Sequence, residues 1–168
     1  MAAGRGIQSA TRAQRCFPAA TTIFVMAAIT LGEDAPQKGT IQISPPDVKW
    51  ADAPLTMPAG TMIAVLEGDP KKEGIFTQRL RVVAGAVVRP HKHPREERVT
   101  VLSGAAFVGF GDTVDKPKAK KFPAGSFYVN PAGVHHYVFF EEETVLQITG
   151  LGPWMVEYLD EQKPQPTK

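Results

Sequence analysis

The stretch GAVVRPHKHPREERVTVLSG, residues 85–104, decides the fold. It places His91 and His93 two residues apart, and Glu97 follows after a short link that contains a proline. Residues i and i+2 of a β-strand point to the same side, so the two imidazoles can face one point. Glu97 can bring a carboxylate to the same point. The spacing therefore indicates a metal site that is supported by strands.

A second segment, GSFYVNPAGVHH at residues 125–136, contains the other two of the chain's four histidines. Neighbouring residues on a strand face opposite ways, so we expect only one of His135 and His136 to bind. Three neutral imidazoles and one carboxylate suit a single divalent transition metal, namely Fe, Mn, Ni, Cu or Zn. Without a thiolate, and with open positions expected, a closed structural zinc site is not indicated.

The rest of the chain has the pattern of an all-β domain. The full chain contains 15 Gly and 15 Pro, which interrupt helices and separate short runs of Val, Ile, Phe and Thr. Phe76, Gln78, Leu80 and Val82 alternate with residues that face the other side. No helix is predicted, and residues 113–121 are expected to be a charged connection. Strands are predicted at 62–67, 76–83, 98–102, 105–110, 127–130, 137–140, 144–149 and 154–159.

At both histidine segments the chain resembles the cupin superfamily. The first motif of that family, G-x5-H-x-H-x3-E-x6-G, is filled at every fixed position, and these are Gly85, His91, His93, Glu97 and Gly104. The second motif, G-x5-P-x-G-x2-H-x3-N, is filled by Gly125, Pro131, Gly133 and His136. Phe140 stands where the family has Asn, which puts a polar role at that position in doubt.

The resemblance covers roughly residues 61–159 and implies a fold, a ligand set and an assembly. The fold is the cupin double-stranded β-helix, or jelly-roll, barrel. The metal ligands are His91, His93, Glu97 and His136, and His135 lies outside them. Small exported bacterial cupins are similar, and members of the superfamily often form a homodimer. Its enzymes include dioxygenases, isomerases, epimerases and decarboxylases, so fold alone does not select a reaction.

Several residues near the motifs are candidates for a substrate pocket. Phe140 and Val138 share the parity of His136, and Arg89 shares the parity of His91, where it could reach a substrate carboxylate. The competing interpretations are barrel core for the apolar residues and an exposed rim position for Arg89. Glu96 is expected to be a solvated neighbour of Glu97. The basic run at 116–121 is expected to be a solvated loop.

The chain is expected to have four parts. Residues 1–35 have a basic start, a short apolar run and then acids and proline, the order of a secretory signal peptide. Export to the periplasm or beyond is therefore expected, although a transit peptide or an over-extended start of a cytoplasmic protein would show similar features. Residues 36–60 are predicted to be an extended arm, 61–159 the barrel and 160–168 a loose tail. The apolar run is too short to span a membrane comfortably, and no membrane span is expected in the mature form.

Charge and cysteine content exclude other classes of function. The formal net charge is +2, with no clustered basic face of the kind that nucleic-acid binding needs. The single cysteine, Cys16, lies in the expected leader, which excludes a disulfide scaffold or a cysteine nucleophile from the barrel. The expected partner is a small-molecule ligand or substrate.

Two hypotheses of function remain. A nitrogen-rich site with open positions in a partly apolar barrel suits a metal-dependent dioxygenase that acts on a small dione, enol or phenolic compound. Resemblance to flavonol dioxygenases implies that Glu97 is then also the catalytic base. The alternative is a non-catalytic module that binds a small ligand or the metal, because no second acid or base can be placed beside the metal. The same ligands would also suit a metal-dependent isomerase or lyase.

Overall fold

The computed structural model describes residues 39–159. The expected leader at 1–35 and the expected tail at 160–168 lie outside the described residues, as do residues 36–38 of the arm, so export stays a prediction. Within the described part, strands dominate and the helical segments are two 3-10 turns, η1 (Pro45–Asp47) and η2 (Lys116–Lys118). No helix in residues 39–159 has the length and apolar composition that crossing a membrane requires.

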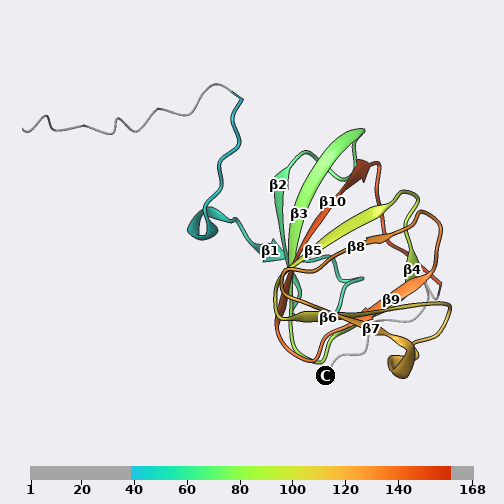
Figure 1. The fold of residues 1–168 in the computed structure, drawn as a ribbon. Helices are drawn as coiled ribbons and strands as arrows, with labels where there is room; N and C mark the ends of the chain where they lie inside the picture. The colour runs from blue at the N-terminus through green and yellow to red at the C-terminus, as the bar shows by residue number, and fades with distance from the viewer. Residues whose placement is uncertain (1–38, 160–168) are drawn as a thin grey trace, which may run out of the picture. The chain divides into compact units, whose positions relative to one another are not determined.

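The strands form two antiparallel sheets that lie face to face (Figure 1). The first sheet has six strands in the order β1 (Ala51–Asp52), β2 (Met62–Glu67), β3 (Gly74–Val82), β10 (Thr144–Gly152), β5 (Glu97–Ser103) and β8 (Phe127–Asn130). The second has five strands in the order β11 (Glu157–Tyr158), β4 (Val87–Lys92), β9 (His136–Phe139), β6 (Ala105–Phe110) and β7 (Lys120–Pro123). This confirms the predicted all-β, jelly-roll fold.

The inner faces of the two sheets make the core. Side chains alternate between buried and partly exposed along β3 and β10, as the pleat of a strand requires. The buried cluster takes Phe76, Leu80 and Val82 from β3, and Leu146 and Ile148 from β10. It continues through β5 and β8 to Val88 and Val138 of the second sheet. One polar side chain, Gln78, lies on the buried face of β3.

The predicted strands differ from the observed ones at a few places. Residues 120–123 form β7 and pair with β6, although 113–121 was predicted to be a charged connection. Its lysines face outward, so the charge concealed the strand. Ala51–Asp52 pairs with β2 inside the segment that was expected to be an arm. Trp154 precedes β11 instead of lying in a strand from 154 to 159.

The motif glycines occupy turns that other residues fit poorly. Gly104 joins β5 to β6 with φ +70°, and a Cβ there would lie 2.5 Å from the carbonyl oxygen of Glu143. Gly133 has φ +72°, and its N–H donates to the carbonyl of His93 at 2.9 Å. This second turn therefore ties the loop before His136 directly to His93.

Candidate metal centre

Three buried imidazoles meet where β4 and β9 run side by side. His91 lies in β4 opposite His136, the first residue of β9, and His93 follows directly after β4. The exposed fractions of these residues are 4%, 0% and 2%. Each ring offers one nitrogen, and the three nitrogens lie within 4.8 Å of one another. Strand pairing thus brings together histidines from both sequence segments, as the spacing predicted.

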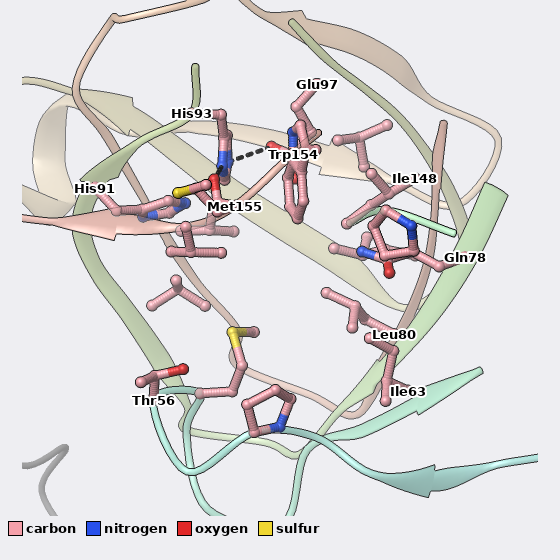
Figure 2. A pocket seen from close by; sticks show the side chains of 18 of the residues that line it. Thr56, Ile63, Gln78, Leu80, His91, His93, Glu97, Ile148, Trp154 and Met155 are labelled. Atoms are coloured by element: carbon pink, nitrogen blue, oxygen red, sulfur yellow. Dashed lines mark hydrogen bonds and ion pairs between the residues drawn. The ribbon is translucent and has the colours of Figure 1, made fainter. Parts of the chain in front are cut away.

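Backbone carbonyls fix the orientation of all three rings. The Nδ1 atoms of His91, His93 and His136 lie 2.7, 2.8 and 3.1 Å from the carbonyl oxygens of Arg89, Met155 and Val134. A carbonyl only accepts, so each Nδ1 must carry the proton and donate. Each ring therefore turns Nε2 to the centre, which is the nitrogen that would bind a metal. Figure 2 shows His93 with its bond to Met155.

The inward nitrogens of His93 and His136 are buried and have no hydrogen-bond partner among the described residues. Burial, together with neighbouring His136 and His93, lowers the pKa of His91 to about 3, so this ring is neutral at physiological pH. Buried ring nitrogens without a hydrogen-bond partner have lost their hydration. A cation at their meeting point would satisfy them. The residues present therefore fit a metal ion.

Glu97 completes this cluster. Its Oε2 lies 3.5 Å from Nε2 of His93 and 3.5 Å from Nε2 of His136. Burial raises the pKa of the Glu97 carboxyl, but these two histidines lower it, and the resulting pKa lies well below the usual range. Asn130 also donates from Nδ2 to Oε2 at 2.7 Å, since Asn130 of β8 is the register partner of Glu97 in β5. The carboxylate is therefore ionised and held toward the imidazoles.

The other candidates for the site face away from it. Nδ1 of His135 is 2.7 Å from Oδ1 of Asp112 at the surface. Glu96 is half-exposed and pairs with Arg98 at 2.6 Å. Lys118 pairs with Asp115, which leaves that part of the basic run at the surface.

A cavity of about 440 Å³ opens beside the cluster and extends between the sheets (Figure 2). Its volume falls in the range that small-molecule sites occupy. The polar or charged groups on its wall besides His91, His93 and Glu97 are Thr56, Lys71, Gln78 and Tyr128. The remaining wall is apolar or aromatic and includes Leu80, Val88, Ile148 and Trp154.

The expected pocket residues occupy different places. Val138 lines the cavity, whereas Arg89 and Phe140 are absent from its wall. The guanidinium of Arg89 lies over the ring of Tyr158, 5.2 Å from its centroid. The register of β4 shifts between Val88 and His91, so Arg89 does not have to face the same side of the strand as His91. Phe140 lies one residue beyond β9, in the core cluster.

Sequence reasoning missed three residues that shape the site. Asn130 holds Glu97, and the ring of Trp154 stacks on His93 with centroids 4.2 Å apart. Gln78 lies on the cavity wall. A signal existed for Gln78, which is a polar residue on the apolar side of a predicted strand. Asn130 gave none, because it shares a face with Tyr128 while the apolar Phe127 and Val129 face the other way. Trp154 gave no signal, because its contact depends on how the segment before β11 folds back.

Comparison with known proteins agrees with this geometry. The family model described as the ChrR cupin-like domain matches residues 38–155. The chain belongs to this cupin family. The resemblance to the cupin superfamily that the two motifs indicated is therefore confirmed.

Curated relatives and solved structures are also similar to this cupin. Germin-like protein 3-1 of Oryza sativa subsp. japonica is 32% identical over 89 residues, which is 52% of this chain and 37% of that protein. The cupin thus spans well under half the length of this plant relative. The polyketide cyclase RemF from Streptomyces resistomycificus matches with a TM-score of 0.58 and 17% identity, over 70% of this chain and 84% of that one.

An acetylacetone dioxygenase from Acinetobacter johnsonii also matches, with a TM-score of 0.58 and 18% identity. The match covers 80% of this chain and 87% of that one. At these identities the likeness of both solved structures concerns the fold alone.

Proposed function

We propose that this cupin is a metal-dependent dioxygenase that acts on a small dione, enol or phenolic compound. The proposal rests on one observation, which is that the histidine and carboxylate cluster adjoins the cavity. A cluster of inward imidazole nitrogens and one ionised carboxylate forms one end of a largely apolar cavity of about 440 Å³. One divalent transition metal (Fe, Mn, Ni, Cu or Zn) would be held by His91, His93, Glu97 and His136.

Charge supports an anionic oxygen ligand as the substrate. Glu97 supplies one negative charge to a divalent ion, and the imidazoles are neutral, so the buried centre keeps one positive charge. An enolate or phenolate oxygen would neutralise it, and burying a neutral centre costs less than burying a charged one. The apolar wall excludes strongly hydrated compounds such as sugars or phosphates.

The metal, when bound, supplies Lewis acidity to the substrate oxygens and access to O₂. The chain's residues prepare the substrate. The Glu97 carboxylate accepts the proton from the carbon between the two carbonyl groups of a dione, and Asn130 holds this carboxylate through Oε2 at 2.7 Å. Cleavage of the dione then places both atoms of O₂ in the products, a carboxylic acid and a 1,2-dicarbonyl compound, and no external reductant is needed.

Two aromatic residues of the wall support this role. Burial and the nearby Glu97 raise the pKa of the Tyr128 phenol well above its usual value, so Tyr128 stays a neutral hydroxyl that can donate a hydrogen bond. Trp154 covers His93 and lines the cavity. Both rings exclude water from the substrate, which protects a carbanion from reprotonation.

The test is oxygen uptake by the metal-loaded protein on a panel of β-diketones and flavonols. We expect one O₂ to be consumed for each molecule of dione lost, with at least one of the metals loaded. His91→Ala should abolish uptake, and His135→Ala, which changes the exposed neighbour of His136, should retain it. No uptake with any metal and any compound of the panel would contradict the proposal.

A non-catalytic binding role is the second candidate, and the composition of the wall favours it. Apart from the metal-binding residues, the wall offers only Tyr128 and Lys71 as groups that transfer protons. Tight binding of a dione without any turnover would establish this role. Turnover without oxygen would instead favour an isomerase or lyase reaction.

The homodimer that the resemblance implies also stays a proposal, which analytical ultracentrifugation would check.

A further inference from the structure

Gln78 is a polar side chain in an apolar place. It lies in the middle of β3 on the face that Phe76, Leu80 and Val82 also occupy, and only 3% of the residue is exposed. Its register partner on β10 is Ile148, and its partner on β2 is Val65. A leucine at this position would continue the core without interruption.

The side-chain amide of Gln78 makes no hydrogen bond to a residue in the described range 39–159, and its polar atoms are not among those sealed off from solvent. A primary amide carries two donors and one acceptor. An amide that faces a cavity can bond to water there, and a ligand with a matching polar group can replace that water. Because Gln78 lines the cavity, the partner available to its amide is water or a ligand in the cavity. Figure 2 shows Gln78 across the cavity from His91.

Strand register places Gln78 relative to the strand that carries Glu97. Gln78 on β3 is opposite Ile148 on β10, Ile148 is opposite Val99 on β5, and Glu97 lies two residues before Val99 on the same face. Two strand spacings separate β3 from β5. At about 4.8 Å each, they place Gln78 roughly 10 Å from the strand that carries Glu97. The cavity of about 440 Å³ that both residues line has room for a small aryl compound.

We propose that Gln78 is a second anchor for the substrate, remote from the metal centre. This inference rests on the proposed function and names the substrate class more closely. The substrate is an aryl compound with a pair of oxygens at one end for the metal centre and a hydroxyl or carbonyl group at the other end for the Gln78 amide. Its middle is apolar, since Val99 and Ile148 line the wall between Gln78 and Glu97.

The test compares two probes that differ by one hydroxyl group, 1-phenylbutane-1,3-dione and 1-(4-hydroxyphenyl)butane-1,3-dione. Each is titrated calorimetrically into the full chain loaded with Zn(II) in the absence of oxygen, so that binding alone is measured. The wild-type protein should bind the hydroxylated dione about tenfold more tightly. Gln78→Leu should reduce this preference to within about twofold, because only the partner of the hydroxyl is lost.

Matched variants separate recognition from structure. Gln147→Leu is the control, because Gln147 lies on the neighbouring strand β10 with its amide oxygen bound to Arg79 at 3.1 Å, and it should keep the preference. Gln78→Met repeats the change with an unbranched side chain in case the leucine variant fails to fold. Both Gln78 variants should unfold at the same temperature as the wild type or higher. A clear loss of stability would show that the amide is structural and would overturn the inference.

A metal-free arm distinguishes failure of this inference from failure of the proposed function. The metal-free protein is titrated with 4-methylphenol and with toluene. If neither dione binds but the wild type prefers 4-methylphenol and Gln78→Leu does not, the dione chemistry fails and the Gln78 anchor stands. If the diones bind and Gln78→Leu keeps the full preference, the anchor is overturned, and the amide serves bound water only. Failure of all four probes to bind would also overturn it.

Discussion

At the scale of single residues, Asn130 orients a proposed metal ligand, Glu97, without being a ligand itself. Its amide donates to Glu97 at 2.7 Å from the neighbouring strand, and both residues are almost completely buried. We expect Asn130→Leu to weaken Zn(II) binding by about 10- to 100-fold, since Glu97 loses the bond that orients it. Competition with a chromogenic chelator measures the affinity. Thr100→Val, on the outer face of β5, is the control, and equal affinities in both variants would contradict this role.

The protonation of His91 predicts how the metal-free protein responds to acid. Burial, with His136 and His93 nearby, lowers the pKa of His91 from 6.5 to about 3. Between these values the unfolded chain binds more protons than the folded chain, so stability falls as the pH is lowered. The free energy of unfolding should be about 2 kcal/mol lower at pH 5 than at pH 7 on account of His91.

Denaturant unfolding of the metal-free protein at both pH values measures this effect. His91→Gln should remove most of the difference, because the glutamine does not titrate. His135→Gln, which changes the surface histidine beside Asp112, should retain it. A difference of the same size in His91→Gln and in the wild type would show that another group is responsible.

At the scale of elements, the segment before β11 closes the site. Met155 accepts from Nδ1 of His93, and Trp154 stacks on the same ring with planes 22° apart. The chain's other tryptophan, Trp50, lies under the guanidinium of Arg81. A paramagnetic ion at the centre should therefore quench Trp154 far more than Trp50.

Fluorescence titration with Cu(II) checks this arrangement. Trp50→Phe should keep nearly all of the quenching, and Trp154→Phe should lose most of it. The opposite result would mean that Cu(II) binds elsewhere or that the segment does not cover His93.

Strand parity predicted part of this arrangement from the sequence and failed where a strand is irregular. It brought His91 and His93 to one side, and it predicted that one of His135 and His136 would turn inward. It did not predict the position of Arg89, because Pro90 lacks an N–H and the register of β4 shifts between Val88 and His91. It also missed β7, whose lysines carry no apolar signal.

At the scale of the whole molecule, alternating apolar residues and Gly/Pro turns predicted an all-β domain, and the resemblance that the two motifs show to the cupin superfamily implied the jelly-roll barrel. The cavity could not be predicted, since its wall combines residues from both sheets with the segments around Met57 and Trp154. Such contacts depend on how distant segments pack. The pocket residues expected from parity alone therefore included only one, Val138, that lines the cavity.

Metal binding should also stabilise the whole molecule. A ligand that binds only the folded state at 1,000 times its Kd adds about 4 kcal/mol to the free energy of unfolding. We therefore expect chelation to lower the Tm of the loaded protein by several degrees. The His91→Ala/His93→Ala double variant should show no shift with chelator. A wild-type Tm that is indifferent to added metal and chelator would argue against binding at this centre.

Metal content tests the central claim most directly. Elemental analysis is made on the full chain, the His91→Ala/His93→Ala double variant and the His135→Ala control. The account predicts close to one equivalent of a transition metal in the wild type and the control, and almost none in the double variant. Absence of metal from the wild type even after reconstitution, or equal content in all three proteins, would contradict it.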